Sequence, residues 1–232
     1  MSALVFVLSS GEEVPVIITT RRGVRNITLR PKVVPKREIH ITKPWLVSSS
    51  AALRFLETKQ KWVESVFQKC PKKISLKPGD VICVFGRNVT LVHDSALRSN
   101  KLTDDGMQLI VGGGADMFER RVRDFVKAQL MQEIKNIIRT VPRDFWPKKI
   151  ALRDTSSRWG SCSSTGTMSF SWRLAFAPVD IMRYVVMHEL AHVKHMDHSP
   201  EFWATVRELY GFGVERAKRW LVQNGACLHE LF

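Results

Sequence analysis

The sequence contains no apolar run of the ~20 residues that a membrane-spanning helix requires. Its apolar stretch at residues 3–8 is too short for a signal peptide, and no basic residue precedes it. Cysteine is also scarce: Cys70, Cys83, Cys162 and Cys227 are scattered and form no C-x-x-C pair, so neither a disulfide framework nor a thiolate zinc site is indicated. These absences predict a cytoplasmic protein without membrane contact.

Acidic residues are few relative to basic ones. The 232 residues include 36 Lys and Arg against 22 Asp and Glu, a net charge of +14. Such a field attracts nucleic acid, nucleotides or acidic proteins. Part of the excess lies between Arg21 and Lys43, where only Glu38 opposes it. Two interpretations stay open: a solvated strand face that repels edge-to-edge pairing, or a basic surface for nucleic acid or nucleotide.

The first 112 residues have the pattern of a β-rich portion with one helix. Val, Ile and Thr enrichment predicts strands at 3–8, 14–20, 24–30, 37–42, 81–85, 88–93 and 107–111. A helix is predicted from a Ser48–Ser50 cap to about Lys69, where Pro71 stops it. Gly112–Gly114 is the strongest break. We therefore predict two domains, 1–112 and 113–232.

The second half has mainly helical periodicity. Asp116 and Glu119 stand in capping-box spacing before a long amphipathic helix reaching about Thr140. The remaining predicted elements are a strand at 149–153, a hairpin at 157–163 and 166–173, a helix from Pro178 to about Met196, a helix capped by Ser199 and a helix at 214–223. The predicted fold is α+β, with the β-rich N-terminal portion packed on a helical half that carries a hairpin.

Residues His188 to His192 match the pattern H-E-x-x-H inside an apolar helix. Histidines four apart share one helix face, so His188 and His192 can bind one cation. From the same turn, the Glu189 carboxylate can accept a proton from a water on the metal. Burying these groups without such a role would cost too much desolvation free energy. The pattern predicts a catalytic zinc site, with Zn²⁺ as the cofactor.

A catalytic zinc needs a third protein ligand, and the nearby candidates are His195, Asp197 and His198. If the helix reaches Met196, His195 lies ~10 Å from His188 along it and cannot share the ion. A turn before Ser199 can bring His198 back toward the metal, so we favour His198. Asp197 or His195 could instead orient an imidazole.

The segment Arg158–Cys162 has two interpretations that stay open. An exposed strand beside the metal could hold an extended substrate through Trp159, Gly160 and Ser161, or Trp159 could simply pack in the core. Tyr184, Arg183 and Arg158 are candidates to stabilise an oxyanion, and spacing does not choose among them. We expect Phe202 and Trp203 to pack behind the site, and Cys162 to be no ligand.

Four segments together resemble the YgjP-like metallopeptidases, which are related to the SprT-type and WLM zincins. These segments are Arg158–Cys162, Ser171–Leu174, Val185–His192 and His198–Trp203. The resemblance extends over about residues 22–220. It implies a gluzincin-like catalytic core with zinc ligands at His188, His192 and His198.

The sequence therefore predicts a zinc-dependent metallopeptidase that cleaves amide bonds by zinc-bound water, with Glu189 as general base. One alternative uses the same metal site on nucleotides, as a nucleoside triphosphate pyrophosphatase does. A second is a DNA-associated, SprT-like protease, and its basic strands would give salt-sensitive binding. The non-enzymatic alternative is a binding module with a closed, structural zinc site.

Overall fold

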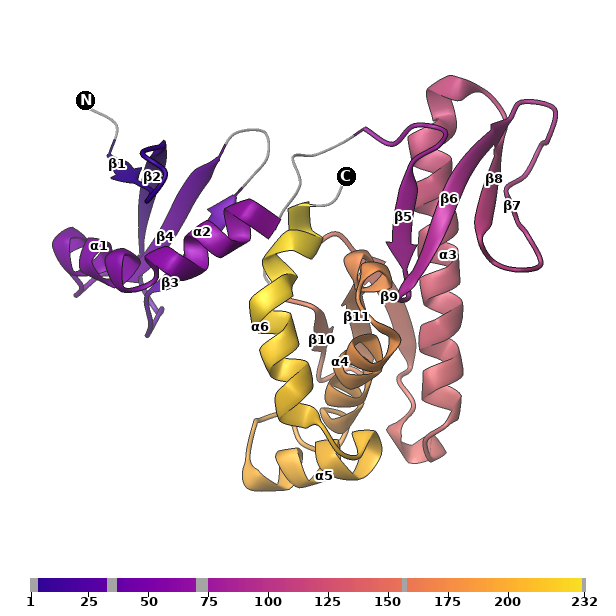
Figure 1. Cartoon of the computed structure of the whole chain (residues 1–232). Helices are drawn as coiled ribbons and strands as arrows, with labels where there is room; N and C mark the ends of the chain where they lie inside the picture. Colours follow the sequence, from indigo (N-terminus) through magenta and orange to yellow (C-terminus); the bar gives the residue numbers. More distant parts are fainter. Residues whose placement is uncertain (1–3, 33–36, 70–74, 156–157, 231–232) are drawn as a thin grey trace. The chain divides into compact units, whose positions relative to one another are not determined.

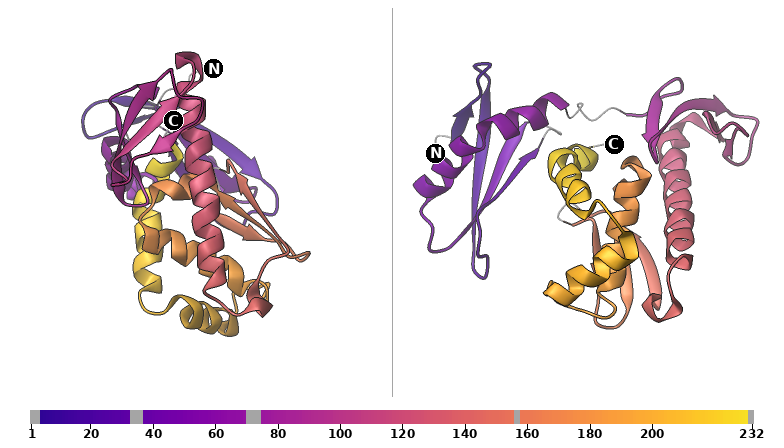
Figure 2. Two further views of the ribbon diagram at one scale, coloured as in Figure 1. Left: turned by 90° about the vertical axis from the view of Figure 1, so that its right-hand side faces the viewer. Right: turned by 60° about the horizontal axis from the view of Figure 1, so that its bottom comes forward.

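The computed structural model describes residues 4–32, 37–69, 75–155 and 158–230, which form an α+β fold as predicted (Figures 1 and 2). The chain divides into two compact units. One comprises residues 1–74 with 224–232, and the other comprises residues 75–223.

The first unit is a four-stranded sheet with two helices. The strands run in the order β1-β2-β4-β3, with β2 and β4 parallel and the outer pairs antiparallel. Their bounds are β1 Val5–Val7, β2 Glu13–Arg21, β3 Thr28–Lys32 and β4 Glu38–Pro44. Alternate residues of β2 and β4, such as Val14 and Ile39, are fully buried against the helices, as the period of two along a strand requires.

The helix predicted after Ser48 is interrupted. Ser48 caps α1 (Ser49–Thr58) by accepting a hydrogen bond from the backbone of Ala51, as expected. α1 ends at Lys59, whose φ of −107° and ψ of 8° leave the helical region, and α2 (Gln60–Lys69) follows. The expectation of one continuous helix is therefore wrong. Pro71, its expected stop, lies outside the described residues.

The second unit begins with a four-stranded sheet packed against a long helix. The strands β5 (Val81–Val84), β6 (Arg87–Asp94), β7 (Lys101–Leu102) and β8 (Gln108–Gly112) have the order β5-β6-β8-β7. β8 pairs with β6 in parallel, and α3 (Phe118–Arg139) contacts β8. The boundary predicted at Gly112 therefore falls inside this unit. A 3-10 turn, Ala115–Met117, precedes α3, and no side chain caps the helix, so the expected capping box does not form.

A three-stranded sheet and three helices complete the second unit. The strands β9 (Lys149–Arg153), β10 (Gly160–Cys162) and β11 (Thr167–Ser171) have the order β10-β11-β9, and β10 and β11 form the predicted hairpin. Two short 3-10 segments, Arg143–Phe145 and Trp172–Phe176, lie before β9 and after β11. The helices are α4 (Val179–Ala191), α5 (Pro200–Tyr210) and α6 (Val214–Glu230). α6 extends beyond its predicted end, and its residues from 224 onward are assigned to the first unit.

The structure bears on two features that the sequence was expected to lack, a membrane-spanning helix and a disulfide framework. Among the described residues, no helix combines the length and apolarity needed to cross a bilayer. Cys83 and Cys162 are free thiols, whereas Cys227 is disulfide-bonded, a bond that the scattered cysteines of the sequence did not indicate. The cytoplasmic location remains a prediction.

Candidate metal centre

The helix α4 carries the first two histidines and the glutamate of the site. Pro178 precedes the helix, where its fixed φ is tolerated, and most of the following side chains through Ala191 are buried. α4 thus packs within the second unit, where it contacts α3, α5 and β10. The helix ends at Ala191 with His192 as its C-cap, five residues earlier than the predicted end near Met196.

The early end of α4 changes the role of the next residues. Backbone turns replace the last predicted helical turn, and the carbonyl oxygen of His195 lies 2.9 Å from His192 Nδ1. That contact leaves His192 Nε2 for a ligand, as is usual for metal-binding histidines. His195 therefore orients His192 through its backbone. Asp197 accepts a hydrogen bond from the backbone of Ser199 and is not in the cluster.

The third histidine is returned to the site by α5. Ser199 caps this helix by accepting from the backbone of Phe202, and Pro200 opens its first turn, as predicted. This cap fixes the chain direction immediately after His198. His188, His192 and His198 then converge, with one ligand atom of each within 4.8 Å of the others.

The spacing of these imidazoles fits a divalent cation. Two nitrogens bound to a tetrahedral ion at ~2.0–2.1 Å lie roughly 3.3–3.4 Å apart. Nε2 of His188 and Nε2 of His198 are 3.3 Å apart. Three imidazoles are also a known ligand set of hydrolytic zinc sites. The residues present therefore fit the ion.

Burial lowers the pKa of two of the histidines, His188 and His192, and so favours their neutral, metal-binding form. Desolvation, followed by the neighbouring His192 and His198, lowers the pKa of His188 to about 4. Burial likewise lowers the pKa of His192, against the carbonyl of His195, which raises it. At neutral pH His188 is therefore uncharged and offers a free lone pair.

Phe202 organises the three rings from behind. Its side chain is fully buried, stacks on His192 with centroids 4.4 Å apart, and meets His188 and His198 edge-on at 4.9 and 4.7 Å. The expected packing role of Phe202 is thus seen directly. Trp203, the next residue, contacts His188 and His198. The Nζ atom of Lys218 in α6 lies 3.6 Å from the centre of the Trp203 ring.

Glu189 is the buried acid of the site. Its side chain is only 5% exposed, and desolvation raises its pKa to about 7, against the charge of Arg158, which lowers it. A methyl group placed on Gly160 would lie 2.5 Å from both Cγ and Oε1 of Glu189. The backbone of β10 therefore lies directly against the Glu189 side chain, and only a glycine leaves room for it.

The other predicted site residues have different positions. Trp159 is half-buried, and its carbonyl accepts from the backbone of Ser171, while Ser161 lies on β10 beside Gly160. Tyr184 is buried one turn before His188, and burial raises its pKa to about 12, so it stays a neutral phenol. Cys162 is outside the histidine cluster, and its thiol pKa is raised by burial and by Glu189.

Three contributions were missed by sequence reasoning. Lys218 acts on His188 by lowering its pKa, and the backbone of His195 holds His192. Neither has a sequence signal, because Lys218 is distant in the chain and a carbonyl group is common to every residue. The close approach of Gly160 to Glu189 also had no signal beyond the glycine itself.

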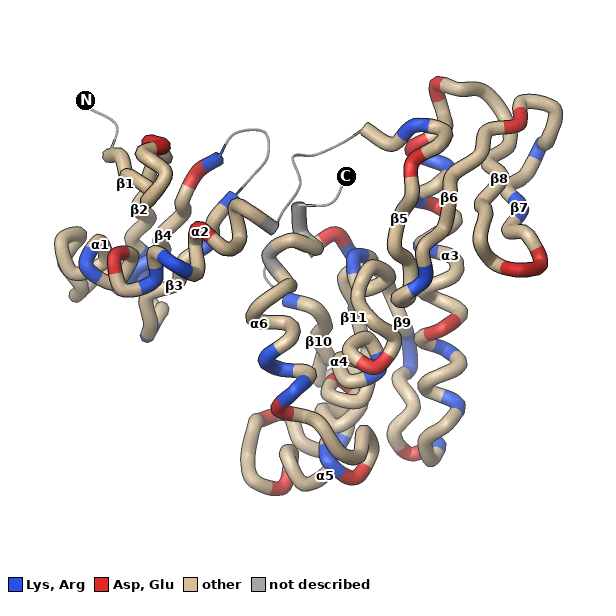
Figure 3. Tube along the Cα trace, in the orientation of Figure 1, with Lys and Arg blue, Asp and Glu red and all other residues tan. Residues whose placement is uncertain are grey.

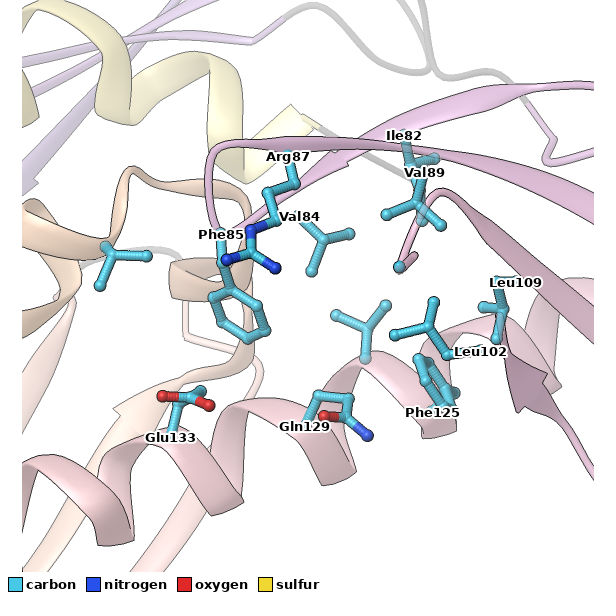
Figure 4. A pocket seen from close by; sticks show the side chains of 13 residues that line it. Ile82, Val84, Phe85, Arg87, Val89, Leu102, Leu109, Phe125, Gln129 and Glu133 are labelled. Carbon is cyan, nitrogen blue, oxygen red and sulfur yellow. The ribbon is translucent and has the colours of Figure 1, made fainter. Parts of the chain in front are cut away.

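A separate cavity of about 360 Å³ lies between α3 and the sheet of β5–β8 (Figure 4). Its walls are mainly apolar, with Phe85 and Phe125 prominent and Arg87 and Glu133 as charged members. None of the three histidines lines it. It is thus distinct from the metal centre.

Three convergent imidazoles beside a buried carboxylate define this part of the chain as a candidate metal-dependent hydrolase site. The chain belongs to the YgjP-like metallopeptidase family, whose metallopeptidase-domain model matches residues 25–224. The family implies a divalent metal, for which the histidine cluster provides ligands.

Two further comparisons add little. The chain is similar to the protein in the crystal structure of the metallopeptidase zymogen of Pyrococcus abyssi abylysin, with 28% sequence identity. The match covers 40% of this chain and 86% of that one, and its TM-score is 0.30. No curated protein matches the sequence significantly.

Proposed function

We propose that this chain is a zinc-dependent metallopeptidase in which His188, His192 and His198 hold the ion and Glu189 is the general base. The observation that carries the proposal is the position of Glu189: buried, one residue from a ligand, and against the backbone of β10. A carboxylate at this position is close both to the proposed metal ligands and to the strand that an extended substrate could join.

The protein groups have separable tasks. When bound, the ion lowers the pKa of a coordinated water toward ~7 and polarises a carbonyl. Glu189 accepts the proton of the attacking water and delivers it to the leaving amide nitrogen. In the metal-free chain burial raises the pKa of Glu189 to about 7, and the charge of a bound ion would favour the carboxylate form that accepts a proton. Arg158, whose charge reaches Glu189, is the favoured candidate to face developing negative charge.

The edge of β10 supports a peptide as the substrate. Among the described strands, β10 pairs only with β11, so Gly160, Ser161 and Cys162 keep backbone groups free on their outer side. An extended peptide can add to such an edge by main-chain hydrogen bonds. Because Gly160 also contacts Glu189, a peptide on this edge passes the general base. Trp159 and Ser161 are then neighbours of the bound chain.

The decisive experiment offers two substrate classes in parallel. Purified full-length protein loaded with Zn²⁺ is incubated with a quenched-fluorescence peptide library and, separately, with nucleoside triphosphates. We expect peptide cleavage that falls by ~10²–10⁴-fold in Glu189→Gln, the range for a lost general base. Release of pyrophosphate or phosphate with no peptide cleavage would replace the proposal with nucleotide hydrolysis at the same site.

The metal is identified by a second measurement. Elemental analysis of protein purified without added ions should give about one zinc per chain, and His192→Ala should lose it. Zinc that survives with four protein ligands and no exchangeable water, as X-ray absorption would detect, contradicts a catalytic site.

A further inference from the structure

The positive charge of the chain is concentrated in the first unit. Its 83 residues contain 14 Lys and Arg against 6 Asp and Glu, so it carries +8 of the chain's +14. The sequence from 14 to 37 contains no acidic residue at all. The three histidines of the metal centre belong to the other unit, so these basic residues are not part of the metal centre.

Strand direction separates the charges within this sheet. β2 and β4 run parallel, and the acidic residues Glu12, Glu13 and Glu38 stand at their beginnings. At the opposite end β2 finishes in Arg21 and continues into Arg22, with Arg25 before β3. Figure 3 shows red at the start of β2 and of β4 and blue where the strands end. Blue also stands beside the red at the start of β4, where Arg37 is paired with Glu12. One end of the sheet is therefore basic.

An exposed tryptophan stands at the same end. The strand register pairs Arg21 with Pro44, and the chain then turns through Trp45 and Leu46, with the backbone of Val47 donating to the Pro44 carbonyl. Trp45 is 61% exposed and Leu46 is 77% exposed. An indole on the surface, next to arginines, departs from the usual burial of large aromatic side chains.

A hydrogen bond from a buried lysine fixes the turn. Lys43 is buried, and its Nζ donates a 2.7 Å hydrogen bond to the carbonyl of Val47. Ser48 then begins α1 as its cap. The tryptophan is thus presented on a fixed turn, so little conformational entropy is lost when a ligand contacts it.

We propose that Arg21, Arg22, Arg25 and Trp45, here called the basic–aromatic end, bind single-stranded nucleic acid. The arginines contact phosphates, and the indole stacks on an unpaired base. Cationic groups beside an aromatic face are the shared features of sequence-tolerant single-strand sites. A duplex is disfavoured because its base faces are already stacked. The proposal is independent of the reaction at the metal centre.

The test is binding of a fluorescein-labelled 15-nucleotide oligo(dT) to the full-length protein, followed by anisotropy at several salt concentrations. Trp45→Ala should weaken binding by roughly 5- to 100-fold, and Trp45→Phe should restore most of it. Replacing Arg21, Arg22 and Arg25 by Gln should reduce the slope of log K against log salt by about 2.

A matched triple variant controls for net charge. Arg120, Lys135 and Arg139 are exposed on α3 in the other unit, and replacing them by Gln removes the same charge. This control should bind the oligonucleotide as the wild type does. Equal losses in both triple variants, unchanged affinity in Trp45→Ala, or equally tight binding of a 15-base-pair duplex would each overturn the proposal. Circular dichroism confirms that every variant is folded.

Discussion

Replacing Gly160 by Ala tests the contact on which the proposed chemistry depends. The backbone of Gly160 is outside the left-handed region, so alanine is conformationally acceptable there and only the new methyl group matters. That methyl would lie 2.5 Å from Cγ and 2.7 Å from Cδ of Glu189. Ordinary carbon contacts are ~3.5–4.0 Å, so the strand and the carboxylate must separate by about 1 Å.

A displacement of this size is large for a catalytic group. Misplacement by ~1 Å can cost about 10²-fold in rate, so we expect kcat to fall about 100-fold in Gly160→Ala. The histidines do not contact Gly160 in this way, so bound zinc should stay at the wild-type level. Ser161→Ala, on the neighbouring residue of β10, is the control and should keep most of the wild-type kcat.

A double-mutant cycle decides whether Gly160 acts through Glu189. Steady-state kcat is measured with a cleaved peptide for wild type, Gly160→Ala, Glu189→Gln and the double variant. If the glycine only positions the carboxylate, the double variant is no slower than Glu189→Gln alone. Losses that multiply would refute this reasoning, as would wild-type kcat in Gly160→Ala.

Three further outcomes are expected. In metal-free protein, Glu189→Gln should raise the free energy of unfolding at pH 8 by up to about 3 kcal/mol and have little effect at pH 5. The reason is that the folded-state pKa of about 7 lies above the ordinary 4.5, so Glu189 lowers stability as pH rises through that window; urea unfolding at both pH values measures it. His192→Ala should lose zinc and turnover together, by elemental analysis and peptide assay, because it removes a ligand from the cluster. Phe202→Ala should destabilise the chain by ~3–5 kcal/mol and weaken zinc binding, since its buried ring supports all three imidazoles; thermal unfolding and competition with a chelator report the two effects.

The sequence predicted the parts of the site that depend on local periodicity. The spacing of His188 and His192 requires only one helical turn, and Ser199 with Pro200 marks a helix start by its own chemistry. These two signals together were enough to select His198. The predicted continuation of α4 to Met196 was wrong, because α4 ends at Ala191 with His192 as its C-cap. The apolar periodicity of the sequence contains no signal for that end.

Tertiary contacts account for what the sequence did not predict. The proposed boundary at Gly112 followed from three consecutive glycines, yet β8 is held to β6 by a parallel pairing that no local pattern reveals. The single helix expected after Ser48 breaks at Lys59, although the apolar periodicity continues across the break because both helices pack on one sheet face. Local composition therefore predicted which helices and strands form more accurately than where each of them begins and ends.

The site combines two demands that oppose each other. In the proposed mechanism a ligand histidine must be neutral, and burial favours that state for His188. The proposed general base must be able to ionise, and burial opposes that state for Glu189. Consecutive residues on one helix share much of the same desolvation, so the helix alone cannot satisfy both. A divalent cation bound by the cluster would resolve the conflict, because its charge would favour ionised Glu189 while its coordination would require neutral His188. Burial therefore favours the form of His188 that binds an ion, whereas the cost of ionising buried Glu189, which lowers the stability of the metal-free protein at high pH, would be offset by the charge of the ion.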